Sequence, residues 1–164
     1  MLHLKMKKIF ICMMGGLISM LSCGTKAPEG ELLSVEYVRN EMSSVPDYEG
    51  HAERATDGTF LLKAMKEGHG SLFQKQLSKE EMSQLRQIIL EEKMYNYKEH
   101  YRPPFQVMDG YQWYFNARFS DGSSIYSSGS NAKPRGEGLQ RIRDCMMRLI
   151  ADADSVVEAH DDDL

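Results

Sequence analysis

The chain has 164 residues, of which 41% are hydrophobic, and its 20 basic and 24 acidic side chains give a formal net charge of −4. This length and composition suit one folded domain. The basic excess of nucleic-acid-binding proteins is absent, so neither DNA nor RNA is expected as a partner.

The N-terminus is typical of an exported precursor. Lys5, Lys7 and Lys8 precede a short apolar run at residues 9–21, and no acid precedes that run. A membrane-spanning helix needs about 20 apolar residues, so we interpret residues 1–22 as a signal peptide that is removed. Removal changes the formal net charge from −4 to −7, because it takes three lysines and no acid.

The end of this segment contains a candidate lipidation site. Residues 20–24, Met-Leu-Ser-Cys-Gly, resemble a lipobox, the motif at which lipoprotein signal peptidase cuts before the cysteine that carries the lipid. The resemblance implies that Cys23 becomes a lipidated first residue, held in the membrane by its acyl chains. We then expect the protein in the cell envelope, anchored to the outer membrane. The alternative is ordinary secretory cleavage beside an accidental cysteine.

The mature chain divides into a polar tether at residues 23–31, a single domain at residues 32–154 and an acidic, disordered tail at residues 155–164. An internal disulfide is not expected, because Cys12 leaves with the signal peptide and Cys23 carries lipid. The remaining cysteine, Cys145, falls in a helical pattern, which favours a packing role over a reactive one.

Alternating hydrophobicity predicts strands in the first half of the domain. Leu33, Val35 and Tyr37 share one face of a strand that ends before the turn-forming residues Pro46, Asp47 and Gly50. Residues 51–66 then predict a hairpin that turns at Asp57-Gly58. Its second strand, residues 59–66, has an apolar face and two glycines at its end: Phe60, Leu62 and Ala64, then Gly68 and Gly70.

The clearest helix begins after Ser78, because Ser78 and Glu81 have the spacing of a capping box. Leu77 and Met82 stand where a hydrophobic staple would pack them together. The helix is predicted to extend to about residue 93, and its apolar face is formed by Met82, Leu85, Ile88 and Ile89.

The strongest strand pattern covers residues 111–119, where one face is apolar: Tyr111, Trp113, Phe115, Ala117 and Phe119. A turn at Ser120-Asp121-Gly122, with Gly122 left-handed, would pair Phe119 with Ser123 and Ala117 with Ile125. This three-residue loop is favoured over a two-residue turn, because it puts Ile125 on the core face of the next strand, residues 123–128.

A second helix is predicted at about residues 138–152, since apolar residues recur three and four apart: Leu139, Ile142, Met146, Leu149 and Ala153. The order of strands, helix, hairpin and helix predicts an α+β fold of two layers. In it, two amphipathic helices pack on one face of an antiparallel sheet.

One block of the chain is similar to known domains. It comprises Asp109-Gly110 followed by Trp113, the alternating strand, the Ser-Asp-Gly turn, and a Gly-Ser-Asn-Ala-x-Pro segment at residues 129–134. In these features it resembles a group of uncharacterised bacterial domains that occur in lipoproteins, those of Bacteroidota among them. The resemblance implies a fold and the lipoprotein class, and it implies no activity and no residue role.

Two segments are candidate binding surfaces. In the loop at residues 129–136, backbone amides and basic side chains could hold an anion; the simpler interpretation is a strand-to-helix connection that needs Gly and Asn for its turns. In the connector at residues 95–105, aromatic and basic side chains could contact a ligand or protein, or could cover the sheet edge or the helix end. The candidate residues are Tyr95, Tyr97, His100, Tyr101, Arg102, Asn131, Lys133 and Arg135.

No metal site, cofactor or catalytic group is predicted. The histidines of the mature chain lack zinc-ligand spacing, residues 161–163 lack the pattern of a calcium loop, and no P-loop occurs. We therefore expect a non-enzymatic binding or interaction module whose partner is an envelope protein or a glycan. Two alternatives stay open: a small envelope hydrolase whose site assembles only in three dimensions, and an inhibitor or chaperone of a secreted partner.

Overall fold

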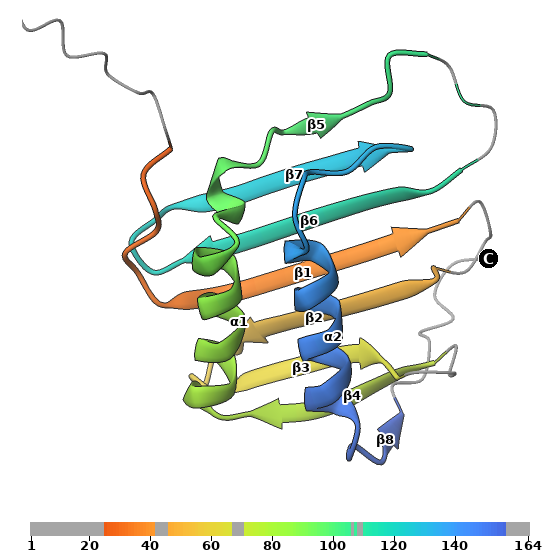
Figure 1. Cartoon of the computed structure of the whole chain (residues 1–164). Helices are drawn as coiled ribbons and strands as arrows, with labels where there is room; N and C mark the ends of the chain where they lie inside the picture. Colours follow the sequence, from red (N-terminus) through yellow and green to blue (C-terminus); the bar gives the residue numbers. More distant parts are fainter. Residues whose placement is uncertain (1–24, 42–45, 67–70, 106, 108–109, 157–164) are drawn as a thin grey trace, which may run out of the picture.

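The computed structural model describes residues 25–41, 46–66, 71–105, 107 and 110–156. Within these residues, an eight-stranded sheet forms one layer and two helices on one of its faces form the other (Figure 1). The predicted two-layer α+β fold is therefore confirmed. The elements are β1 (Leu32–Asn40), β2 (Tyr48–Arg54), β3 (Phe60–Met65), β4 (Leu72–Leu77), α1 (Lys79–Glu91), the 3-10 turn η1 (Met94–Asn96), β5 (His100–Tyr101), β6 (Gln112–Phe119), β7 (Ser124–Ser130), α2 (Gly138–Ile150) and β8 (Ser155–Val156).

The strand order across the sheet is β5-β7-β6-β1-β2-β3-β4-β8. All neighbouring pairs are antiparallel except β5 with β7, which is parallel. Both edge strands have two residues, and such short edges limit further strand pairing. Because β8 pairs with β4, the fold extends two residues past the predicted domain boundary at residue 154. The rest of the predicted tail, residues 157–164, lies outside the described residues.

The core lies between the sheet and the two helices. The four apolar residues of β6 and both predicted helix stripes are buried there: Trp113, Phe115, Ala117 and Phe119, then Met82, Leu85, Ile88 and Ile89, and finally Leu139, Ile142, Met146, Leu149 and Ala153. Burying an aliphatic or aromatic side chain of this size contributes roughly 1.5–3 kcal/mol. Cys145 is also buried, as the packing interpretation predicts, and burial raises the pKa of its thiol.

The hairpin formed by β6 and β7 has the predicted three-residue turn. The Phe119 N–H donates to the Ser123 carbonyl oxygen at 3.0 Å, and Ala117 lies opposite Ile125. Gly122 has a φ of 83°, which a residue with a side chain adopts only at a cost. The earlier hairpin is likewise present, with β2 and β3 joined through Asp57-Gly58, whereas Gly68 and Gly70 lie outside the described residues.

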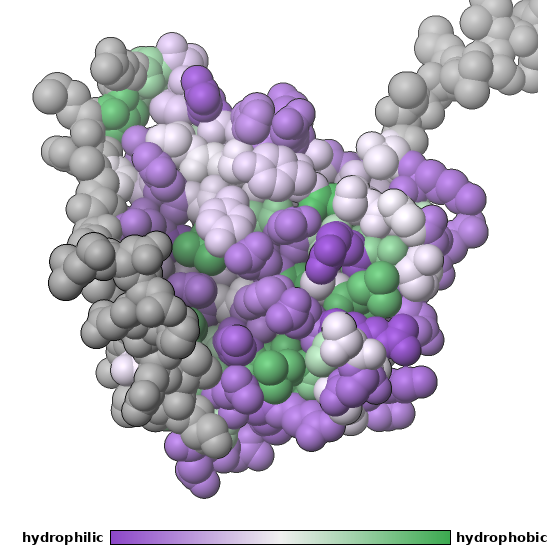
Figure 2. Space-filling model, turned by 180° about the vertical axis from the view of Figure 1, so that it is seen from behind, coloured by the Kyte–Doolittle hydropathy of each residue, from purple (hydrophilic) through white to green (hydrophobic). Residues whose placement is uncertain are grey.

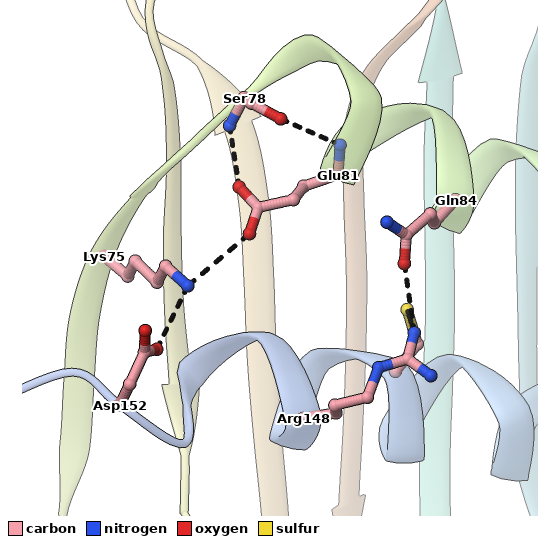
Figure 3. Close-up of polar contacts among 7 residues, drawn as sticks. Lys75, Ser78, Glu81, Gln84, Arg148 and Asp152 are labelled. Carbon is pink, nitrogen blue, oxygen red and sulfur yellow. Dashed lines mark hydrogen bonds and ion pairs between the residues drawn. The ribbon is translucent and has the colours of Figure 1, made fainter.

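The predicted capping box begins α1. The Ser78 Oγ accepts from the Glu81 N–H at 3.1 Å, and the Glu81 carboxylate accepts from the Ser78 N–H at 2.8 Å (Figure 3). Lys75 on β4 also contacts Glu81, and it pairs with Asp152 just beyond α2 at 3.0 Å. The cap therefore joins the start of α1 both to the sheet and to the end of α2.

A bulge changes the predicted facing of β1. The pairing with β6 shifts between Leu32 and Ser34, so the extra residue, Leu33, leaves the helix-facing side. Leu32 takes its place in the core beside Val35 and Tyr37. The simple alternation that assigned Leu33 to the core face was therefore wrong at this position.

Gly50 lies inside β2 and does not end a strand, contrary to its predicted role as a breaker. A Cβ at this position would lie 2.4 Å from the Tyr48 Oη and 2.7 Å from the Met146 Sδ. The absence of a side chain lets α2 approach the middle of the sheet, so Gly50 serves close packing.

Candidate functional site

The chain enters the domain at the start of β1, where the predicted tether is bound to the fold. The Asp121 carboxylate accepts from the Glu29 and Gly30 N–H groups at 2.8 and 2.9 Å, and Arg86 Nε donates to the Gly30 carbonyl oxygen at 2.7 Å. Hydrogen bonds from the Ser123 hydroxyl and then from backbone N–H groups lower the pKa of Asp121 well below its usual range. The last part of the tether is thus fixed at this end of the sheet.

The sheet face opposite the helices is open and polar (Figure 2). One row of side chains crosses six strands on this face: Tyr126, Asn116, Glu36, His51, Lys63 and Gln74. Antiparallel sheets commonly pack one face on the core and expose the other to solvent, and this sheet follows that arrangement.

A groove of about 480 Å³ lies at the edge formed by β5, β7 and β6. We call it the tyrosine groove and define it by six of its lining residues: Val38, His100, Arg102, Tyr114, Tyr126 and Ser128. Side chains alternate between the two faces of a strand, and the pairing of β6 with β7 places Tyr114, Tyr126 and Ser128 on the open face. The groove therefore opens on the face that carries no helix.

Hydrogen bonds and ring contacts hold the side chains of the tyrosine groove. The Tyr114 Oη donates to the Glu36 carboxylate at 2.9 Å, and burial, followed by Glu36, raises the pKa of that phenol. The His100 Nδ1 lies 2.8 Å from the Ser128 Oγ, and the His100 ring meets Tyr126 edge-on with centroids 6.4 Å apart. Tyr126 is 52% exposed, so the groove presents a large aromatic ring to solvent.

The helix-facing side of the same edge is built around Trp113. Its ring contacts Tyr101 at a centroid distance of 5.8 Å, and its Nε1 donates to the Ala132 carbonyl oxygen at 2.8 Å. Gly129 leaves room for this ring, because a Cβ there would lie 2.4 Å from Trp113 Nε1. Tyr97 then meets Tyr101 edge-on, so three rings cover the end of the core.

A second, smaller cavity of about 130 Å³ lies beside these rings, and we call it the helix-side cavity. It lies between the C-terminal end of β1, the N-terminal end of β6 and the start of α2. Its lining includes Tyr37, Arg39, Tyr97, Tyr111, Trp113, Lys133 and Gly136. Burial, followed by the nearby Glu92 charge, raises the pKa of Tyr97 to about 12, so its hydroxyl stays protonated at neutral pH.

Five of the eight predicted site residues line one of these two places. His100, Tyr101 and Arg102 line the tyrosine groove, and Tyr97 and Lys133 line the helix-side cavity.

The other three predicted residues line neither. Tyr95 packs against the core, and Arg135 is exposed. Asn131 has a φ of 54°, and its Oδ1 accepts from the Tyr111 N–H at 3.0 Å. Asn131 thus shapes the loop, which is the simpler interpretation given above for that segment.

The lining residues that sequence reasoning missed include Arg39, Tyr111, Tyr114 and Tyr126. All four belong to strands or strand ends that the pattern identified, but the pattern does not show which strands lie side by side. Tyr114 and Tyr126 fall at positions of the predicted strands that face solvent, where polar residues are expected. Two aromatic rings on the solvent face were the signal that could have indicated a binding surface.

Two further hollows lie at the other end of the sheet. One, of about 440 Å³, borders the start of α1, where Arg86 is already bonded to the tether. The other, of about 650 Å³, lies between the two hairpin turns and includes Arg54 and Arg118. The Arg118 Nε donates to Ser34 Oγ at 2.8 Å. Because Arg86 and Arg118 are already engaged in these hollows, we place the candidate site at the tyrosine groove.

Comparison with known proteins identifies no relative: no protein-family model matches the chain, and no curated protein sequence matches it. Among the described residues, no three His, Cys, Asp or Glu side chains come together as a metal site would require. No helix in the described part of the chain is both long and apolar enough to cross a membrane.

Proposed function

We propose that this protein is a binding module of the cell envelope, anchored in the outer membrane through lipid on Cys23, that takes a ligand at the tyrosine groove without transforming it. The observation that carries the proposal is the groove itself, where exposed aromatic and hydroxyl groups converge on an open sheet face. Aromatic residues are enriched at interfaces, and binding sites combine apolar walls with a few placed polar groups.

A cell-wall glycan suits this lining better than a cationic partner does. The six residues that define the groove supply two phenol groups, one further hydroxyl, one imidazole and one guanidinium, and none of them is an acid. Such a set offers flat apolar surfaces, hydroxyl groups and one cation, which match the ring faces, hydroxyl groups and carboxylates of a cell-wall glycan. An envelope protein is the other partner class, and the experiment below separates the two.

The position of the groove agrees with an anchor at Cys23. The tether is bound at the start of β1, whereas Val38 in the groove lies near the end of the same strand. Val38 lies six positions after Leu32, which is about 20 Å along the strand at about 3.3 Å per residue. The strand β1 runs from the tether to the opposite end of the sheet (Figure 1), so the groove lies at the end away from the anchor, toward the wall or another envelope component.

Co-sedimentation of the full chain with purified cell-wall sacculi tests the proposal. Binding should occur, and Tyr126→Ala and Arg102→Ala should each weaken it by at least about tenfold, the effect of losing an interface residue that contributes about 1.4 kcal/mol or more. Arg54→Ala is the matched control, because Arg54 is an exposed arginine at the opposite end of the sheet. Equal losses in Arg102→Ala and Arg54→Ala would refute a site at the groove.

Failure of the chain to sediment with sacculi would exclude a cell-wall glycan. A pull-down from envelope extract with the same three variants then tests the protein partner. One stoichiometric protein, retained by Arg54→Ala and lost by Tyr126→Ala, would identify a protein-binding module. The absence of both partners would refute the proposed function.

A further inference from the structure

The helix-side cavity is lined by two cations and by no carboxylate among the described residues. Arg39 projects from the end of β1, and Lys133 belongs to the loop that precedes α2. Glu41, which does not line the cavity, pairs with one terminal nitrogen of Arg39. The Arg39 Nε is buried and has no partner within the described part of the chain. A buried donor without an acceptor is unfavourable, so an acceptor atom in the cavity would stabilise it.

The walls of the cavity fix the position of these groups. The Arg39 guanidinium lies over the Tyr111 ring, 5.0 Å from its centroid, an arrangement that restricts a long and otherwise mobile side chain. The Tyr97 hydroxyl lies close to the first turn of α2, because Gly138 has no Cβ there; a Cβ would lie 2.4 Å from that oxygen. The cavity thus has a held cation and a phenol donor at its sides.

The start of α2 adds a favourable field. This helix has no acid in its first turn, and the exposed Glu137 at its N-cap makes no side-chain cap, whereas α1 has a capping box and two glutamates in its first turn. Gly136, which precedes α2, and Leu139 and Gln140 in its first turn line the cavity. Unpaired N–H groups and the helix dipole at such an end favour an anion, which acts in the same direction as the two cations.

Size and shape select the kind of anion. The volume of about 130 Å³ corresponds to about four water molecules at about 30 Å³ each, which is room for a carboxylate with a few carbon atoms. A planar guanidinium matches a planar carboxylate, and aromatic walls suit an apolar body. We propose that the helix-side cavity binds the carboxylate group of a small ligand, with Arg39 and Lys133 neutralising its charge and Tyr97 donating a hydrogen bond.

This site is distinct from the tyrosine groove, because it lies on the helix-covered face of the sheet, although Trp113 lines both. Trp113 is the one tryptophan of the sequence and it lines the cavity, so its fluorescence reports on binding. The full chain is titrated with sodium propionate at constant ionic strength, and propionamide is the uncharged control of nearly the same shape. We expect a saturable change with propionate and none with propionamide.

Three variants locate the binding. Arg39→Gln and Lys133→Gln should each weaken propionate binding by at least about tenfold, the effect of a lost charge-assisted hydrogen bond. Arg135→Gln should leave it unchanged, because Arg135 is exposed in the same loop and does not line the cavity. If the contact of Arg39 with Tyr111 is essential for folding, Arg39→Gln unfolds the chain. In that case Lys133→Gln still tests the site, because Lys133 is exposed and its replacement should not affect folding.

Three results would overturn the inference: no saturable change with propionate, an equal effect of Arg135→Gln, or a response to inorganic phosphate without one to propionate. Tyr126→Ala should not alter the titration. A negative propionate titration therefore does not refute the proposed function at the tyrosine groove. Likewise, a negative sacculus experiment does not refute the carboxylate site in the helix-side cavity.

Discussion

Replacing Gly129 with alanine should disturb the aromatic edge on which both sites depend. The new Cβ would lie 2.4 Å from Trp113 Nε1, 2.6 Å from Trp113 Cε2 and 2.4 Å from the Ala132 carbonyl oxygen. Heavy atoms do not approach so closely, so the indole has to move. The movement breaks the hydrogen bond from Trp113 to Ala132, which is 2.8 Å long, and loosens the contact with Tyr101.

The expected cost follows from these two losses. Overpacking a well-filled site costs about 1–3 kcal/mol, and a lost hydrogen bond costs about 1 kcal/mol, so the free energy of unfolding should fall by about 2–4 kcal/mol. With a urea dependence of about 2 kcal/mol per molar, the midpoint of unfolding should fall by about 1–2 M. Trp113 is 4% exposed, so its emission should shift to longer wavelength when the ring is displaced.

Urea titration followed by tryptophan fluorescence measures both effects in one experiment. Ser124→Ala is the control, because Ser124 is an exposed residue of the same strand and should shift neither quantity. A midpoint for Gly129→Ala within about 0.3 M of the parent chain, with unchanged emission, would show that the edge accepts a side chain at this position. The account of why β7 carries glycine there would then be wrong.

Four further outcomes are expected. Ser78→Ala removes the cap of α1 and should lower the free energy of unfolding by about 1 kcal/mol, measured by urea titration; a change below about 0.3 kcal/mol would show that the capping box is unimportant. Asp121→Asn should weaken the binding of the tether, measured as a loss of hydrogen-exchange protection at the Glu29 and Gly30 amides. Because the folded pKa of Asp121 is lowered, its contribution to stability is complete above the ordinary pKa near 3.8 and is lost as pH falls through the lowered pKa. The NMR signals of the Glu29 and Gly30 amides should therefore stay constant above about pH 5 and move in stronger acid. Cys23→Ala should release the protein into the soluble fraction, and its persistence in the membrane would contradict lipid anchoring.

Much of the fold followed from local patterns in the sequence. The capping box at Ser78 and Glu81, the turn at Asp57-Gly58 and the three-residue turn ending at Gly122 each depend on a few neighbouring residues, and all three are present. In the capping box and in the turn at Asp57-Gly58, the residue types themselves favour the local hydrogen bonds and backbone geometry. The three-residue turn also needed the expectation that Ile125 faces the core.

The parts that escaped prediction depend on distant contacts. Strand β4 has only Leu72, Phe73 and Leu77 as apolar residues in its six positions, so its alternation is weak, and pairing with β3 is what makes it a strand. Strand β5 has two residues, and it exists because His100 and Tyr101 meet β7.

The helix-side cavity was predictable only in part for the same reason. The aromatic connector and the basic loop were recognised from their composition, and the structure brings Tyr97 and Lys133 to one cavity. Arg39 joins them from more than fifty residues earlier in the chain. Its contribution requires β1 to lie beside β6, a pairing that local patterns do not specify.

The most direct test of the central claim is hydrogen–deuterium exchange of the full chain with and without soluble cell-wall glycan fragments. A ligand in the tyrosine groove should slow exchange at the first half of β6 and the second half of β7, and should leave the turn between β2 and β3 unchanged. Protection confined to that turn, or no protection anywhere at saturating fragment, would contradict a glycan-binding module that uses the tyrosine groove.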